Sequence, residues 1–202
     1  MILTACIDFC KSTYGLIVRP YETMRRVSSH ASYWELLPLG VVLSAYFGTA
    51  SIVKTASFRP FLLTKQFIVM GSVAALTFGV VTGLVWFVSK TIGGVGTYKS
   101  IIIGWGYSML PTVAWFFATS LLYIVIPPPR TTGVLGMTFS IVFLTFSTVL
   151  LLWKIILGYL TLRFGMRLDL WKIIGVVLLS SPAISAYCYI LYIMGIWKVP
   201  FM

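Results

Sequence analysis

The sequence contains few charged residues and very few acidic ones. Its 202 residues include four carboxylates (Asp8, Glu22, Glu35 and Asp169), a single histidine and no asparagine. Acid–base catalysis and metal binding both draw on these residue types. The composition therefore argues against an enzyme, and it predicts no metal site and no cofactor.

Cysteine is also scarce. The chain has three cysteines, Cys6, Cys10 and Cys188. Such a small, odd number makes no disulfide framework and fits a reducing compartment or the interior of a membrane.

Apolar side chains are present in large excess. Hydrophobic residues make up 59% of the chain, charged residues make up 9%, and the mean hydropathy is +1.01. In a soluble domain about a quarter of the residues are charged. Because a helix needs roughly 20 apolar residues to cross a bilayer, the sequence predicts an all-α, polytopic transmembrane bundle at residues 36–202. The five expected spans are 36–53, 67–89, 101–126, 134–153 and 173–196.

The end of the fourth span is ambiguous in the sequence. Apolar residues continue past Trp153 and Lys154 as far as Leu162. Lysine is less costly at the membrane interface than at the bilayer centre. We therefore place the end of this span near Trp153 and keep a longer helix, ending near Leu162, as the alternative.

The distribution of basic residues predicts the orientation. The formal charge is +11, from 15 Lys and Arg, and the basic residues are dispersed over several loops with no nucleic-acid-binding module. Ten of them lie in the N-terminal region and in the second and fourth loops, which share one side of the membrane. The other five lie on the opposite side of the membrane. Positive charge stays on the cytoplasmic side, so we expect a cytoplasmic N-terminus and an external C-terminus, in the cell inner membrane if the source is prokaryotic.

Residues 1–35 are expected to form a cytoplasmic segment that lies in the membrane interface. Pro20 suits the first position of a helix, and Glu22 complements the positive end of the helix dipole. Tyr21, Met24 and Val27 then share one face of that helix. The residues expected to contact anionic lipid headgroups are Arg19, Arg25, Arg26, Lys99, Arg163 and Arg167.

Small residues recur every four positions in the first two spans. They are Gly40, Ser44 and Gly48 in the first span, and Gly71, Ala75, Gly79 and Gly83 in the second. Small residues allow helix backbones to approach closely in lipid. Packing within the chain is the favoured interpretation, and contact between copies of the chain is the alternative.

Proline interrupts two spans, at Pro111 in the third and Pro182 in the fifth. Both residues are expected to kink their helices, and Ser180 and Ser181 can partly satisfy the carbonyls that Pro182 leaves free. Broken helices form binding sites in transporters, which keeps transport of a neutral or lipidic solute as an alternative function. No carboxylate lies inside an expected span, so the usual proton or sodium relay is missing.

A glycine-rich turn, Gly93-Gly94-Val-Gly96-Thr-Tyr98-Lys99, links the second and third spans. A phosphate-binding loop would need glycine directly before Lys-Ser and a preceding β-strand. Here Tyr98 occupies the glycine position and a membrane helix precedes the turn, so we interpret it as a tight cytoplasmic turn.

Several motifs together resemble the Yip family, the Ypt/Rab-interacting membrane proteins. They are the Arg19-Pro20-Tyr-Glu-Thr-Met24-Arg lead, the glycine turn, Gly106-Tyr107-x-x-x-Pro111, Trp153-Lys154 and Leu170-Trp171-Lys172. The resemblance implies five spans, with the N-terminus inside and the C-terminus outside. Eukaryotic members have a long soluble N-terminal region and act with small GTPases. Only about 35 residues precede the first span here, which looks like the compact prokaryotic members.

These observations favour a non-enzymatic membrane protein that acts as a scaffold or an accessory subunit. Its expected partners are anionic membrane lipids and either another membrane protein or a second copy of the chain, and no nucleic acid is expected. Transport of a small neutral or lipidic solute is the runner-up.

Overall fold

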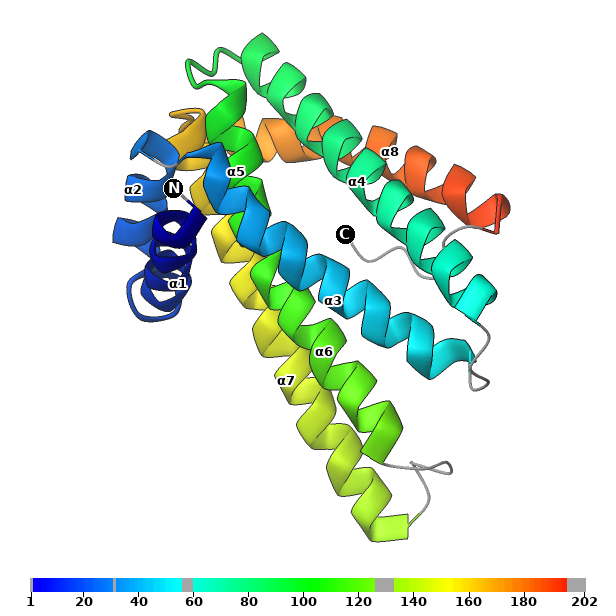
Figure 1. The fold of residues 1–202 in the computed structure, drawn as a ribbon. Helices are drawn as coiled ribbons and strands as arrows, with labels where there is room; N and C mark the ends of the chain where they lie inside the picture. Colours follow the sequence, from blue (N-terminus) through cyan, green and yellow to red (C-terminus); the bar gives the residue numbers. More distant parts are fainter. Residues whose placement is uncertain (1, 31, 56–59, 126–132, 196–202) are drawn as a thin grey trace.

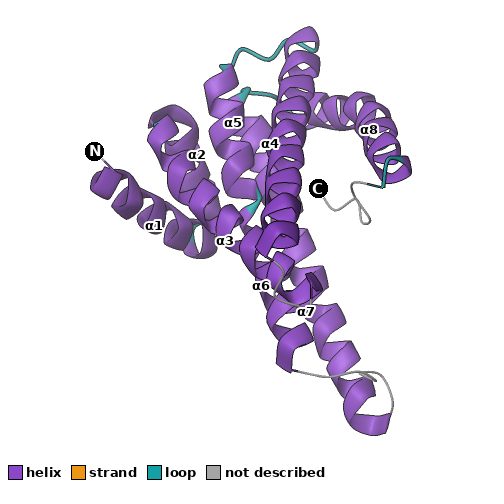
Figure 2. Cartoon of the chain, turned by 45° about the vertical axis from the view of Figure 1, so that its right-hand side comes forward, coloured by secondary structure: helices purple, strands orange, loops and turns teal. Residues whose placement is uncertain are grey.

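The computed structural model describes residues 2–30, 32–55, 60–125 and 133–195. Within these ranges the regular structure is helical throughout, and the helices spread out from one end of the molecule, where the N-terminal helix pair packs (Figures 1 and 2). The elements are α1 (Ile2–Val18), α2 (Pro20–His30), η1 (Tyr33–Glu35), α3 (Leu36–Thr55), α4 (Pro60–Thr91), α5 (Tyr98–Ser108), α6 (Leu110–Val125), α7 (Gly133–Leu160), η2 (Thr161–Gly165) and α8 (Leu170–Ile193).

Four helical stretches of the described residues are long and apolar enough to cross a membrane. They are Phe67–Thr91, Tyr98–Leu122, Gly136–Gly165 and Leu170–Ile193. Helix α3 coincides with the expected first span but is not among these four. The protein is thus a multi-pass, all-helical membrane protein, while the fifth span and the orientation of the termini stay predictions.

The start of helix α4 differs from the start expected for the second span. Helix α4 begins at Pro60 instead of residue 67, because proline fits the first helical position, where its missing N–H is not needed. Lys65, expected in a loop, therefore lies on α4. Arg59, Arg130 and Lys198 of the charge count lie outside the described residues.

The fourth span continues as the longer of the two alternatives. Helix α7 passes through Lys154 to Leu160, and η2 extends it with a π-helical turn to Gly165. Beyond Lys154, Leu157 is fully buried and Leu160 is only 5% exposed, whereas Ile155 and Ile156 are 59% and 49% exposed. Hydropathy extends past the lysine because one face of this end of the helix belongs to a protein core.

Helix α5 lies between two apolar cores. The first core joins α1, α2, α3, α5 and α7, and its buried residues are Phe9, Leu16, Met24, Val27, Leu39, Ile103, Tyr107, Leu157 and Leu160. The second joins α4, α5, α8 and the η2 region, through Val81, Val85, Ile101, Leu162, Met166, Leu168, Ile173 and Val176. The other helices are therefore positioned relative to α5.

Helix α2 begins at Pro20, as expected. Part of its apolar face is covered by other residues of the chain. Met24 is fully buried and Val27 is 3% exposed in the first core, while Tyr21 meets Phe164 edge-to-face at 4.8 Å between ring centroids and is 51% exposed. The Ser100 hydroxyl also donates to the Ser28 carbonyl at 3.0 Å, which ties α2 to α5. Met24 and Val27 are thus used for packing within the chain, and the contact of residues 1–35 with the membrane interface stays a prediction.

A buried hydrogen bond joins the residue before α3 to the last turn of α5. The Tyr107 hydroxyl donates to Glu35 Oε2 at 2.5 Å, and the Ser32 backbone N–H donates to Glu35 Oε1 at 3.2 Å. Glu35 is 9% exposed and Tyr107 is 2% exposed. Both carboxylate oxygens therefore have partners in an apolar environment.

The glycine-rich turn packs directly on the backbone at the end of η2. A Cβ atom at Gly96 would lie 1.7 Å from the Gly165 carbonyl oxygen, and one at Gly94 would lie 2.8 Å from the Ser89 carbonyl oxygen. The Val95 N–H donates to the Met166 carbonyl at 3.1 Å. Gly93 has φ +93°, a conformation that glycine adopts without strain. The turn between α4 and α5 therefore packs directly against the connection that joins η2 to α8.

We expect Gly96→Ala to destabilise the protein by about 1–3 kcal/mol, because the methyl group would force the two backbones apart. Gly79→Ala is the matched control, since a Cβ there meets none of the described atoms within 4 Å. Thermal unfolding of both variants in the same detergent measures the difference. A Gly96→Ala variant as stable as Gly79→Ala would contradict the tight contact.

Tyr107→Phe is expected to destabilise the protein by about 1–3 kcal/mol, because it leaves a buried carboxylate oxygen without its donor. A double-mutant cycle with Glu35→Ala tests the pair. We expect the two losses to be clearly less than additive, since each substitution removes the same interaction. Additive losses in the free energy of unfolding would show that the hydrogen bond contributes little.

Candidate functional site

The six basic residues expected at lipid headgroups gather at one end of the molecule. They lie on α2 or directly before it, at the start of α5 and around η2, and these elements pack on one another. Arg19 pairs with Glu22 at 3.6 Å on the surface, and Lys99 lies 5.3 Å from the centre of the Tyr33 ring. The others are exposed too: Arg25; Arg26, which donates to Ser12 Oγ at 3.4 Å; Arg163, which donates to the Tyr159 hydroxyl; and Arg167. The structure thus forms one basic end.

The small residues of α3 and α4 lie on open helix faces. A Cβ at Gly40, Gly48, Gly71 or Gly79 would meet no described atom within 4 Å. Ser44 and Ala75 are exposed. We call these six positions the open small-residue faces. Gly83 differs, because its Cβ would lie 4.0 Å from the Tyr98 hydroxyl.

The packing expected at the open faces is made by other residues. Helix α3 meets α6 through aromatic rings, with Tyr46 stacked on Phe116 at 4.6 Å between centroids. Close backbone approach occurs instead on α5, where a Cβ at Gly104 would lie 2.7 Å from Thr161 and one at Gly106 would lie 2.8 Å from Leu36. Internal packing of the open faces is therefore not made with the described residues.

Pro111 breaks the third span, as expected. The helix stops at Ser108, Met109 forms a turn, and α6 begins at Leu110. Pro111 itself is fully buried. Tyr98, at the other end of α5, meets Trp86 edge-to-face at 5.6 Å between ring centroids, which holds the glycine turn against α4.

Pro182 lies inside α8, and the helix continues through it. Its missing N–H leaves the Leu178 carbonyl without its usual partner. The Ser181 hydroxyl donates to this carbonyl at 3.5 Å, and the Ser180 hydroxyl donates to the Val176 carbonyl at 2.7 Å. Ser181 therefore satisfies this carbonyl as expected, whereas Ser180 bonds to a carbonyl that Pro182 does not free, and the helix is not interrupted.

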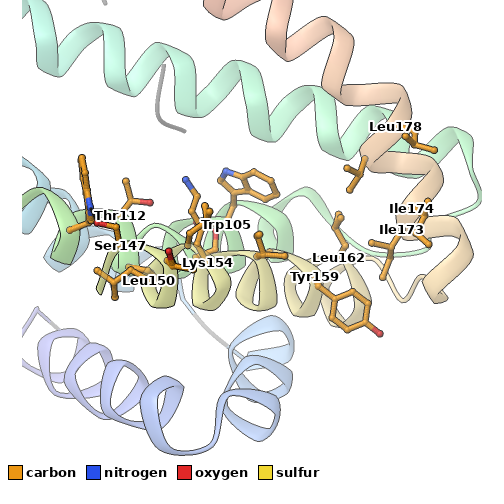
Figure 3. A pocket seen from close by; sticks show the side chains of 18 of the residues that line it. Trp105, Thr112, Ser147, Leu150, Lys154, Tyr159, Leu162, Ile173, Ile174 and Leu178 are labelled. Carbon is orange, nitrogen blue, oxygen red and sulfur yellow. Dashed lines mark hydrogen bonds between the residues drawn. The ribbon is translucent and has the colours of Figure 1, made fainter. Parts of the chain in front are cut away.

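A groove of about 840 Å³ runs between α5, α6 and α7 on one side and α8 on the other (Figure 3). Trp105, Pro111 and Leu144 are among its lining residues from the first group, and Ile173 and Val177 are among those from α8. The lining is almost wholly apolar and includes one charged residue, Lys154. This volume lies within the range of ligand sites in proteins.

Sequence reasoning missed two features of this arrangement. Glu35 and Tyr107 are 72 positions apart, and no motif links them. Lys154 was interpreted only as a boundary marker, although its position inside a long apolar run was the available signal.

Side chains suited to metal binding do not converge in the described residues. No three His, Cys, Asp or Glu side chains there lie close enough to share a metal ion. Cys6 and Cys10 are exposed, and Cys188 is half-buried. The arrangement offers surfaces and an apolar groove, which suit binding.

Comparison with curated proteins returned no match, and comparison with solved structures returned none. The Yip1 domain family model matches residues 14–193, nearly the whole chain. The matched region contains the lead at Arg19 and Pro20, the glycine turn and the Gly106-Tyr107-x-x-x-Pro111 step. On this match and its apolar helices, the chain is a multi-pass membrane protein that belongs to the Yip1 domain family.

Proposed function

We propose that this protein is a non-enzymatic membrane scaffold or accessory subunit that organises partners or lipids. The observation that supports it best is the contrast between two sets of glycines. Gly94, Gly96, Gly104 and Gly106 are in tight internal contact, whereas Gly40, Gly48, Gly71 and Gly79 meet no described atom.

This contrast favours a helix partner at the open faces. In lipid, helices associate where small residues let their backbones approach and make van der Waals contact. The chain already uses glycine in this way around α5. The open small-residue faces offer the same chemistry to a transmembrane helix of another protein or of a second copy.

The basic end supports a second part of the proposal, contact with anionic lipids. Arg25 and Arg26 are exposed on one short helix, and Arg19 is exposed directly before it. Basic residues near a membrane surface each contribute about 1 kcal/mol to binding acidic headgroups. With the basic end on the cytoplasmic side, the protein has its N-terminus inside, its C-terminus outside and five spans, in the cell inner membrane if the source is prokaryotic.

Transport of a lipidic solute is the second candidate function, and the groove beside Pro111 favours it. A carrier of polar solutes needs a polar, water-accessible cavity near the broken helices. The groove is apolar, and Pro182 is not part of its lining. The alternative is therefore narrowed to a solute with a long apolar part.

Ala75→Leu and Gly79→Leu test the scaffold role, because a leucine side chain on the open face would keep a partner helix at a distance. We expect each to reduce the partner or second copy that co-purifies from native membranes by about ten-fold, measured by native mass spectrometry. Ala183→Leu, at an exposed position on α8, is the matched control and should leave the complex intact. Equal recovery of the complex in all three variants would overturn the role of these faces.

Replacing Arg19, Arg25 and Arg26 together by glutamine tests the lipid contact. In nanodiscs of mixed neutral and acidic phospholipids, we expect the variant to lose enrichment of acidic lipid around the protein. The wild-type enrichment should fall as salt is raised, because exposed charges are screened within about 10 Å at 0.1 M salt. Unchanged enrichment in the triple variant would exclude this contact.

A further inference from the structure

The groove defined by α5, α6, α7 and α8 contains one charged side chain, and that charge is not balanced. Lys154 is half-buried and makes no ion pair or hydrogen bond with the described residues. None of the four side-chain carboxylates of the chain lines the groove. A positive charge among apolar side chains is costly unless it reaches water or meets an anion.

Two further hydrogen-bond donors lie near Lys154 in the groove. Trp105, Thr112 and Lys154 come from three different helices and point to the same side, away from the α1–α2 pair (Figure 3). The Trp105 indole N–H and the Thr112 hydroxyl have no hydrogen-bond partner in the part of the chain that the structure describes. An indole N–H can only donate, and an ammonium group can only donate.

The other hydroxyl groups of the groove each have a partner, including the Tyr159 hydroxyl, which accepts from Arg163. Ser147 accepts from Trp115 Nε1 at 2.8 Å and donates to the Phe143 carbonyl at 2.8 Å. Ser108 and Thr148 donate to backbone carbonyls on their own helices, at 2.7 and 2.9 Å. The unused polar groups of the groove are therefore one cation and two neutral donors, which together suit an anion.

The position of Lys154 along α7 indicates where that anion would sit. Leu151 and Leu152, just before it, are each 55% exposed, whereas Leu157 after it is fully buried. Ile155 and Ile156 are still 59% and 49% exposed, so Lys154 lies where one face of α7 begins to be covered by the protein core. With an anionic lipid headgroup at Lys154, the apolar chain of the lipid would lie along the exposed stretch of the groove, beside Leu144 and Val177.

We propose that this groove binds one anionic phospholipid, with its phosphate at Lys154, Trp105 and Thr112 and an acyl chain along the apolar lining. Charge complementarity selects the anion, and the apolar remainder of the groove selects the chain. The site is separate from the basic end and from the open small-residue faces. A lipid can occupy it whether or not a partner binds those faces, so the inference goes beyond the proposed scaffold role.

Native mass spectrometry of the full chain, released from nanodiscs of phosphatidylcholine and phosphatidylglycerol, tests the proposal. At high salt, which removes lipids held only by exposed charges, the wild type should retain one phosphatidylglycerol. Lys154→Met keeps the length of the side chain and removes the charge, and it should reduce this retention by about ten-fold or more. Lys154→Arg should preserve it, and Lys90→Met, at an exposed lysine outside the groove, should not change it.

Val177→Trp provides an independent test, because it fills the groove and leaves Lys154 in place. We expect the same loss of bound lipid, with thermal unfolding close to that of the wild type. Retention of phosphatidylglycerol by Lys154→Met or Val177→Trp would overturn the proposal. Equal retention of phosphatidylcholine by the wild type, or a bound fatty acid in place of a phospholipid, would also overturn it. If Lys154→Met or Val177→Trp lost the partner complex but kept the phospholipid, the lipid proposal would fail while the scaffold role would stand.

Discussion

The close contact between the glycine turn and the end of η2 is the constraint on which the rest of the fold depends. Gly96 meets the Gly165 carbonyl at a distance that leaves no space for a Cβ atom, and the Val95 N–H bonds to Met166 beside it. Eight residues along, Gly104 faces Thr161. These contacts press α5 against the end of α7, and α5 in turn separates the two cores. In lipid, where apolar helices gain little from burial against each other, such close backbone approach is a main source of specificity.

The groove follows from the same constraint. Helix α7 is held to α5 by the first core, whereas α8 starts after η2 and packs on α4 through the second core. The Thr77 and Tyr187 hydroxyls hydrogen-bond at 3.0 Å, which fixes α8 to α4. Because α7 and α8 pack on different neighbours, the two helices diverge with increasing distance from η2, which lies between them in the chain (Figure 1). Apolar side chains of both helices line the groove between them. Such surface carries no hydrophobic penalty inside a bilayer, so the fold can keep it open.

Hydropathy and proline predicted much of the architecture and little of the tertiary packing. The apolar runs and Pro20 located the helices, and Pro111 marked the break between α5 and α6. Hydropathy could not separate the lipid-exposed part of α7 from the buried part after Lys154, because both need the same side chains. Nor could four-residue spacing show that Gly71 and Gly79 are open while Gly104 is tightly packed. The spacing shows which residues share one face of a helix, but not which other element packs on that face. The Glu35–Tyr107 pair is formed by the fold across 72 positions and left no local pattern.

Two isolated charged residues in apolar surroundings, Glu35 and Lys154, differ in whether the chain supplies their hydrogen-bond partners. Glu35 has both oxygens satisfied, by Tyr107 and by the Ser32 N–H, so its role is complete within the chain. Lys154 has no such partner among the described residues, although an uncharged side chain would fit an apolar groove at lower cost. Translocon scales put a lysine at the centre of a membrane helix at about 3 kcal/mol. A chain that satisfies its buried carboxylate so fully gains nothing structural from leaving its groove lysine unpaired. We therefore assign the counter-charge of Lys154 to the proposed ligand outside the chain, because an anion with an apolar tail fits both the charge and the groove.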